Sequence, residues 1–465
     1  MTHRDRIQSK VRFNFEYLKL AMEFLLRDTN WGTVNWRTDC TWGSPRLLTI
    51  VALLWVWSDE KLVADRFSTA RRIALTMYPQ SPKVAESFQG FMKLLKHWST
   101  VIASELKSAL QERMLEQFPD SMKIGKFNIM AIDGSRIGLP RTESNENEFS
   151  AKRHQQKGKA KKHRDKSAEK KANTVTMWIT TLWHCGTGLP WNWRLGPSDS
   201  IERTHWLEML GELTSPVLFL GDAGFVGYEY AKAVIAAGHE MLIRVGSNVT
   251  LIKGLGYATQ REDLVYLWPN KTANRNEPPL VFRLVVCNNG KHPVYLLTSI
   301  LSPRELSDLN VIAAYKRRWG IEIFYRHLKQ TYGKHKLKSR SSEAAYVEMT
   351  WAFLGIWCMA LYALKQLQAN GISASRLSFA KLIRAFQRMM RDFALPGEKN
   401  CKLCDLLEDA VIDEYQRGSK TSRDYPRKKN ERPPGPPKIR RATKQEIARA
   451  KQLEQQIPSK IRLTA

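Results

Sequence analysis

The sequence predicts a mixed α/β protein with a helical N-terminal domain, a β-rich insertion and a basic C-terminal tail. Short apolar runs at 127–133 and 216–222 each end in Asp, which is typical of buried strands that deliver a carboxylate at their end. Apolar residues recur at helical spacing through 1–110 and again after 302. Two strand-like runs flank Asn288-Asn-Gly290, which predicts a β-hairpin. Together these patterns indicate one α/β layer with additions.

The predicted elements follow one another in chain order. Helices are expected first, over 62–72 and 88–110, with Ser81-Pro82 as a start signal. The α/β region is then expected to contain strands 127–133, 175–185, 191–195, 216–222 and 241–245 and helices 201–213 and 228–237. The hairpin strands are 279–287 and 293–299. Ser302-Pro-Arg-Glu305 predicts a new helix start, with Ser as cap and Glu completing a capping box, and helices 343–368 and 379–393 follow.

These elements suggest a division of the chain into five parts. The expected parts are a helical domain at 1–110, the first part of the α/β domain at 126–246, the β-rich insertion at 247–301, the second part with its following helices at 302–395, and a basic, partly disordered tail at 396–465. Basic residues lie on the polar faces of the N-terminal helices. They are equally compatible with a bundle that binds DNA and with a solvated face of a structural bundle.

The charge balance indicates a polyanionic partner. The chain has 74 Lys+Arg against 45 Asp+Glu, a net charge of +29. Residues 151–173 contribute ten cations and two acids (+8), and residues 416–465 contribute fifteen cations and four acids (+11). Nucleic acid is the expected partner, since each neutralised phosphate releases counterions. The rival is an anionic membrane surface. The apolar runs 47–57 and 351–364 are shorter than the ~20 residues of a membrane span, so core helices of a soluble protein are expected there.

A helix around Glu322 gathers polar residues on one face. At 100° per residue, five side chains share one sector, namely Tyr315, Arg318, Glu322, Arg326 and Lys329. The apolar residues of the helix lie on the opposite side. Surface ion pairs worth about 0.3–0.5 kcal/mol each are the plainer interpretation of this pattern. The two strand-end acids favour another: Asp133, Asp222 and Glu322 suit divalent metal ions and a phosphodiester held by cations.

The spacing of these residues resembles the signature of bacterial insertion-sequence DDE transposases of the IS-four family. That signature is Tyr315, two residues, Arg318, three residues, Glu322, six residues, Lys329. Asp133-Gly-Ser135 and Gly221-Asp-Ala-Gly224 are similar to the other two acidic motifs of the family. The resemblance covers residues 126–330. It implies an RNase H-like mixed sheet with helices on both faces, interrupted by a β-rich insertion before the glutamate.

The resemblance also implies a function. Asp133, Asp222 and Glu322 would be the catalytic residues and the ligands of two Mg²⁺ ions, with Mn²⁺ as a substitute. Tyr315, Arg318, Lys329 and Arg244 would bind DNA, and the shared helical sector adds Arg326 to the cations expected to hold the phosphate backbone. The expected protein is a homodimer, in the bacterial cytoplasm and associated with the nucleoid. It would pair the terminal inverted repeats of an element, cleave there and join the 3′ ends to target DNA. A metal nuclease on the same fold and an inactive DNA-binding relic are the alternatives.

The sequence departs from the family at one position. Hairpin-forming members have a Trp before the Leu296-Leu-Thr298 strand, where it stacks on a flipped base, and this chain has Val294. Valine has no π face, so another aromatic ring must stack on the base, or the reaction proceeds without a hairpin intermediate. Tyr295, His292 and Trp268 are the candidates for the stacking role.

Overall fold

The computed structural model describes residues 3–37, 40, 42–80, 84–119, 123–150, 175–213, 215–256, 261–288, 292–391, 401–412 and 435–453. The helices in these ranges are α1 (His3–Leu26), α2 (Pro45–Trp57), α3 (Val63–Met77), α4 (Phe88–Gln117), α5 (Glu143–Phe149), α6 (Glu202–Leu210), α7 (Tyr228–Ala236), α8 (Asp308–Arg317), α9 (Trp319–Arg326), α10 (Ser342–Ala369), α11 (Phe379–Met389), α12 (Leu403–Glu408) and α13 (Lys444–Gln452). The strands are β1 (Lys123–Ile124), β2 (Phe127–Gly138), β3 (Thr176–His184), β4 (Leu189–Gly196), β5 (Val217–Gly221), β6 (Glu240–Val245), β7 (Thr250–Lys253), β8 (Leu264–Leu267), β9 (Leu280–Asn288), β10 (Pro293–Thr298) and β11 (Lys438–Arg441).

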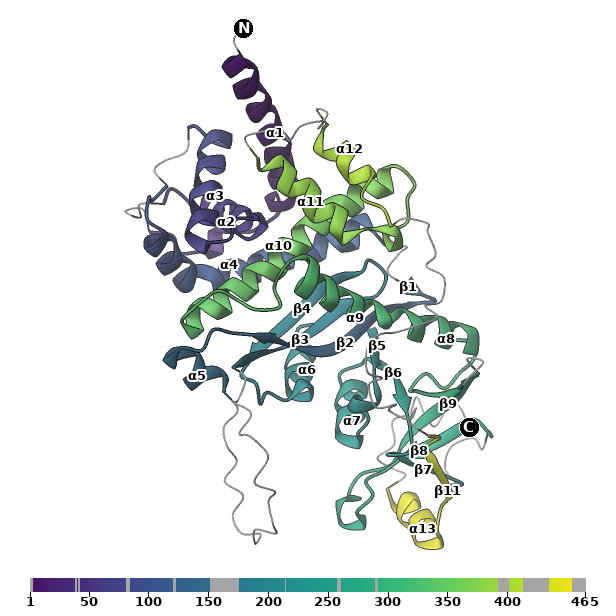
Figure 1. The fold of residues 1–465 in the computed structure, drawn as a ribbon. Helices are drawn as coiled ribbons and strands as arrows, with labels where there is room; N and C mark the ends of the chain where they lie inside the picture. Colours follow the sequence, from purple (N-terminus) through teal and green to yellow (C-terminus); the bar gives the residue numbers. More distant parts are fainter. Residues whose placement is uncertain are drawn as a thin grey trace, which may run out of the picture.

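One mixed sheet runs through the described part of the chain, in the order β11-β7-β8-β9-β10-β6-β5-β2-β3-β4 (Figure 1). The pairs β2–β5, β5–β6 and β7–β11 are parallel, and the other pairs along this order are antiparallel. The predicted hairpin is formed by β9 and β10. Because β10 also pairs with β6, with Leu296 opposite Arg244, the β-rich segment continues the same sheet.

Helices cover both faces of the sheet, as the sequence analysis predicted. Side chains of β2 alternate between two cores: Ile129 and Ala131 enter one, and Met130 and Ile132 enter the other. The first core lies under α9 and α10, and the second lies against α6 and α7 (Figure 1). The central strands are therefore buried on both sides, which explains their nearly continuous apolar sequence.

Strand β2 is longer than predicted. This strand was predicted to end at Asp133, whereas β2 continues to Gly138 because β3 pairs with it along that length, with Gly138 opposite Thr176. The parallel pairing with β5 ends earlier, at Ala131 opposite Leu220. Asp133 therefore lies inside β2 but just beyond the end of the parallel ladder, and this position still places its carboxylate at the edge of that ladder.

The long helix α10 is the centre of the larger core. It is apolar and long enough to cross a membrane, longer than the run 351–364 suggested, but 94% of its most apolar window is buried inside the protein. The N-terminal helices pack around it: the Trp57 indole donates to the Gly355 carbonyl at 2.9 Å. A Cβ at Gly355 would lie only 2.6 Å from Val56, so glycine permits this close approach. The N-terminal helices therefore share one core with helices that follow the Glu322 region.

The predicted helix start at Ser302 is wrong by one turn. Residues 302–306 form a single turn, and Ser307 then adopts an extended conformation. Helix α8 begins at Asp308, where the Ser307 hydroxyl accepts a hydrogen bond from Asn310 N at 3.2 Å. The buried Arg283 guanidinium donates to the Leu306 carbonyl at 2.5 Å and holds this turn against β9.

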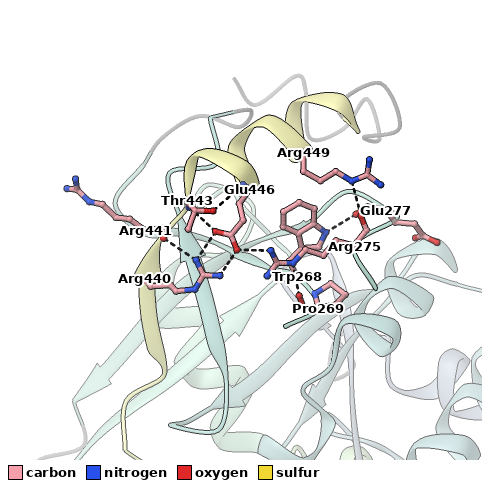
Figure 2. A network of polar contacts seen from close by, with 9 residues as sticks. All are labelled: Trp268, Pro269, Arg275, Glu277, Arg440, Arg441, Thr443, Glu446 and Arg449. Atoms are coloured by element: carbon pink, nitrogen blue, oxygen red, sulfur yellow. Dashed lines mark hydrogen bonds and ion pairs between the residues drawn. The ribbon is translucent and has the colours of Figure 1, made fainter. Parts of the chain in front are cut away.

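The C-terminal segment 435–453 is folded onto the β-rich segment (Figure 2). Glu446 of α13 accepts from Arg275 at 2.7 Å, from Arg440 at 2.5 and 2.8 Å, and from Thr443 N at 2.8 Å. The Arg275 guanidinium also lies over the Trp268 ring, 4.8 Å from its centroid. This part of the tail, predicted to be partly disordered, is thus ordered by a buried ion network. The other tail residues after 412 lie outside the described residues.

We expect the change Glu446→Gln to release this segment. The change leaves the buried Arg275 without its anion, at a cost of about 3 kcal/mol. Hydrogen bonds from Arg440 lower the pKa of Glu446 from its ordinary 4.5 to about 2. The stabilisation that Glu446 gives to the docked segment 435–453 should thus be fully present above pH 4.5 and should be lost as the pH falls towards 2. Limited trypsin digestion measures the docking, with Glu408→Gln in the exposed end of α12 as control. Equal cleavage of the segment 435–453 in both variants would contradict the assignment.

Candidate active site

Asp133 lies among charged groups at the end of the parallel ladder. Its Oδ1 accepts a hydrogen bond from Gly134 N at 3.0 Å. Burial raises the pKa of Asp133 to about 6; Asp222 and Glu322 also raise it, while the Gly134 N–H and Arg318 lower it. The three predicted acids are therefore close enough to interact electrostatically, although they come from two strands and a helix.

Asp222 directly follows β5. It is the N-cap of a short 3₁₀ helix, Ala223–Phe225, and its Oδ1 accepts from Gly224 N at 2.7 Å. Arg203, on α6, holds this turn from the outside by donating to the Gly224 carbonyl at 2.7 Å and the Val226 carbonyl at 3.2 Å. These hydrogen bonds connect the loop that carries Asp222 to α6. This contact was not predicted from the sequence.

Glu322 lies on α9 and forms an ion pair with Arg318, with NH2 and Oε1 2.6 Å apart. The Arg318 side chain is only 12% exposed and lies 5.7 Å from the Tyr315 ring centroid. Burial raises the pKa of Tyr315, with Arg318 and Arg244 opposing and Asp222 adding to this effect. Tyr315, Arg318 and Arg244 therefore lie near the same acids, Asp222 and Glu322. The opposite face of α9 is buried, as the helical spacing predicted.

Lys329 and Arg326 have different environments. Lys329 lies on a π-helical turn, His327–Thr331, that continues α9. Burial lowers the pKa of Lys329 and Asp133 raises it, which places its amine near that carboxylate. Arg326 is exposed, and no interaction among the described residues connects it with the acids. The π turn is a common feature of functional sites, and it orients Lys329 differently from a regular helix.

Tyr325 attaches helix α9 to the sheet. Its hydroxyl donates to the Asp133 carbonyl at 2.8 Å and lies 3.0 Å from Thr181 Oγ1 on β3. The side chain is buried, 5% exposed. Since Glu322 is one turn earlier on α9, this contact sets its position relative to Asp133. Tyr325 could not be identified from the sequence, because a tyrosine near a buried helix face is typical of an ordinary core residue.

A further acid, Glu202, lies next to Asp133. It is the first residue of α6, and burial raises its pKa to about 8, with Asp133 and Asp222 adding to this effect and Arg203 and the Gly134 N–H opposing it. Its Oε1 atom is buried and has no hydrogen-bond partner among the described residues. In the sequence, a Glu in the first turn of a helix is explained by the helix dipole alone, so nothing there associated it with Asp133.

The chemistry of this site suits a hard divalent cation. Carboxylate oxygens are the ligands that Mg²⁺ prefers, and the buried, unpartnered Glu202 Oε1 is the kind of atom that a cation would satisfy. Within the described ranges, no group of three or more His, Cys, Asp or Glu side chains is arranged so that it could hold a metal ion. A cation bound by these acids would take further oxygens from water and phosphate.

The candidates for base stacking differ in accessibility. Trp268 is excluded, because it is 2% exposed and covered by Arg275, and its indole donates to the Glu277 carbonyl at 2.8 Å. Tyr295 is half-buried and His292 is exposed. Trp319, beside Arg318 in the sequence, is 58% exposed and is an aromatic ring that the sequence analysis did not consider. The basic stretch 151–173 lies outside the described residues.

Comparisons with known proteins match the region that contains these acids. A family model described as "Transposase DDE domain" matches residues 125–358. The chain is 27% identical over 240 residues to transposase InsG of insertion sequence element IS4 from Escherichia coli strain K12, covering 49% of this chain and 52% of the relative. It thus spans about half the length of that relative. A cryo-EM structure of the piggyBac transposase synaptic complex with hairpin DNA is similar with a TM-score of 0.38 and 13% identity, covering 89% of this chain and 87% of the other.

We expect Tyr325→Phe to loosen the site without unfolding the protein. The loss of the hydrogen bond to Asp133 should lower the free energy of unfolding by about 1–2 kcal/mol. It should also reduce the rise in melting temperature caused by Mn²⁺, because Glu322 is no longer held against Asp133. The matched control is Tyr332→Phe, which removes a buried 2.8 Å hydrogen bond to the Val56 carbonyl away from the acids. If both variants respond to Mn²⁺ alike, Tyr325 has no special role at the site.

Proposed function

The chain belongs to the transposase DDE domain family, whose model covers half of its length, and on that premise we propose that it is the DNA transposase of an insertion sequence. The observation that carries the proposal is the position of the acids. Asp133, Asp222 and Glu322 all lie within the matched residues 125–358, and the electrostatic environment of Asp133 includes the other two. The scaffold would be an RNase H-like domain, extended by the β-rich segment.

The proposed reaction consists of two phosphodiester exchanges. In cleavage, a water oxygen bonds to the phosphorus at the element end, the bond to the 3′ oxygen breaks, and a 3′ hydroxyl remains. In strand transfer, that hydroxyl attacks a target phosphodiester and displaces the 3′ oxygen of the target strand. Asp133, Asp222 and Glu322 would hold two Mg²⁺ ions, or Mn²⁺ in their place. When bound, these ions would activate the attacking oxygen and stabilise the leaving one.

The protein's own cations would hold the DNA backbone. Arg318 has a planar guanidinium that suits a phosphate and is fixed by Glu322 and Tyr315. Lys329 and Arg244 add positive charge near Asp133 and Tyr315, respectively. Arg326 would bind phosphate farther from the acids, in keeping with its exposed position. These groups fix position rather than read sequence.

The partners follow from the same proposal. The terminal inverted repeats of the element and a target DNA are the substrates, and two protomers would pair two ends. The basic stretches 151–173 and 416–465 would add sequence-independent affinity for DNA. The N-terminal helices are candidates for contact with the ends. The protein would act in the bacterial cytoplasm, at the nucleoid. A metal nuclease on this scaffold would cleave without producing joined strands, so a strand-transfer assay separates the two functions.

We expect Ala at each of the three acids to abolish cleavage and strand transfer. Each change removes a carboxylate from the centre but leaves the core of the sheet intact. Binding to end DNA in a mobility-shift assay should therefore persist, while joined products on a denaturing gel should disappear. Glu229→Ala, in the exposed first turn of α7, is the control. Normal strand transfer by Glu322→Ala would contradict the proposed function.

We expect Arg318→Lys to reduce the cleavage rate although the charge is kept. A lysine ammonium cannot pair with Glu322 and lie flat beside Tyr315 at once, and misplacement of a reacting group by about 1 Å can cost about 10²-fold in rate. Single-turnover cleavage at saturating DNA measures the effect. Arg317→Lys changes the exposed neighbouring residue and should have the wild-type rate. Equal rates for the two variants would mean that the planar group is not needed.

A further inference from the structure

Glu202 is partly buried, and one of its carboxylate oxygens, Oε1, is fully buried. The two acidic side chains that are wholly buried in the described residues are both paired. Glu348 Oε2 accepts from Lys338 N, Ser339 N and Ser339 Oγ at 2.8–3.0 Å, and its other oxygen lies 3.6 Å from the Lys334 ammonium. Glu446 is paired with two arginines. The Glu202 Oε1 atom, by contrast, has no partner among these residues.

The position of Glu202 is set by its contact with the strand that carries Asp133. A Cβ at Gly134 would lie 2.8 Å from Glu202 Oε1 and 2.6 Å from the Trp178 ring. Only glycine at this position lets the Glu202 carboxylate approach the β2 backbone beside Asp133. The Asp-Gly pair at 133–134 thus serves two purposes: the aspartate supplies a carboxylate, and the glycine makes room for a second one.

Among the described residues, no cation pairs with Glu202 Oε1. The adjacent Arg203 uses its guanidinium for the Gly224 and Val226 carbonyls and lies over the Tyr230 ring, 4.7 Å from the centroid. Arg318 is engaged with Glu322. The negative charges of the nearby Asp133 and Asp222 repel a Glu202 carboxylate. A divalent cation between these groups would convert the repulsion into attraction.

We propose that Glu202 is a fourth carboxylate of the metal site, acting with Asp133 and Asp222 on one divalent cation, directly or through a bound water. The inference rests on the proposed function, because that function supplies the metal. It assigns α6 two roles at the site. Glu202 faces the cation, and Arg203 fixes the turn that presents Asp222. Glu322 lies on α9, with Arg318 as the N-cap of that helix, so three of the acids lie near α6 and one lies on α9.

The test is Mn²⁺ binding by the full chain without DNA, measured by electron paramagnetic resonance. Glu202→Gln keeps the size of the side chain and removes its charge. We expect the affinity for Mn²⁺ to fall about 10–100-fold, as for other groups that support a metal site. Glu229→Gln is the matched control, because it changes an exposed acid in the first turn of the neighbouring helix α7. Wild-type Mn²⁺ affinity in Glu202→Gln would overturn the proposal.

Two further measurements complete the test. Strand transfer by Glu202→Gln should be reduced at low Mn²⁺ and partly restored at high Mn²⁺, which a purely structural defect would not allow. If Glu202→Gln does not fold, Glu202→Asp replaces it: weaker Mn²⁺ binding supports the proposal, and wild-type binding overturns it. A wild-type chain that binds Mn²⁺ through Glu202 but joins no DNA would contradict the proposed function alone.

Discussion

Partly buried negative charge at the end of the parallel ladder is the constraint on which the candidate site depends. Taking carboxylates out of water is costly unless hydrogen bonds, cations or protonation compensate. Some compensation is present: Gly134 N donates to Asp133, Gly224 N donates to Asp222, and Arg318 pairs with Glu322. This compensation is incomplete, because the pKa of Asp133 is still raised to about 6. This incomplete compensation is the strongest physical reason to expect a cation.

The scaffold keeps these charges in place through rigid elements. The sheet presents Asp133 and Asp222 from neighbouring parallel strands, and α9 presents Glu322 across from them. The Tyr325 hydroxyl connects the helix to the strand, and Arg203 connects the Asp222 turn to α6. Sites built on packed elements hold their geometry better than sites on loops. The extensive core around α10 gives this frame its support from one face of the sheet.

The buried ion pairs elsewhere in the protein have a different character. Lys334 and Glu348 lie 3.6 Å apart and are 5% and 2% exposed, and Glu446 is enclosed by arginines (Figure 2). In both places each charge has its partner, so the groups order the chain. The Glu446 network fastens the C-terminal segment to the β-rich segment, which lies on the same sheet as Asp222. Paired charges thus shape the fold here, whereas the candidate site contains a buried carboxylate oxygen, Glu202 Oε1, without a partner among the described residues.

The sequence alone determined the local features of this protein. Alternating apolar strands, the helical sector around Glu322 and the hairpin at 288–290 are properties of neighbouring residues, and the spacing of four residues was enough to indicate the family. Tertiary structure decided what depends on distant contacts. Strand β2 runs past Asp133 because β3 pairs with it, Trp268 is hidden by Arg275, and Glu202 is brought beside Asp133 by the packing of α6. No short-range pattern records such contacts, because the free energy of burial depends on which surfaces meet in the folded chain.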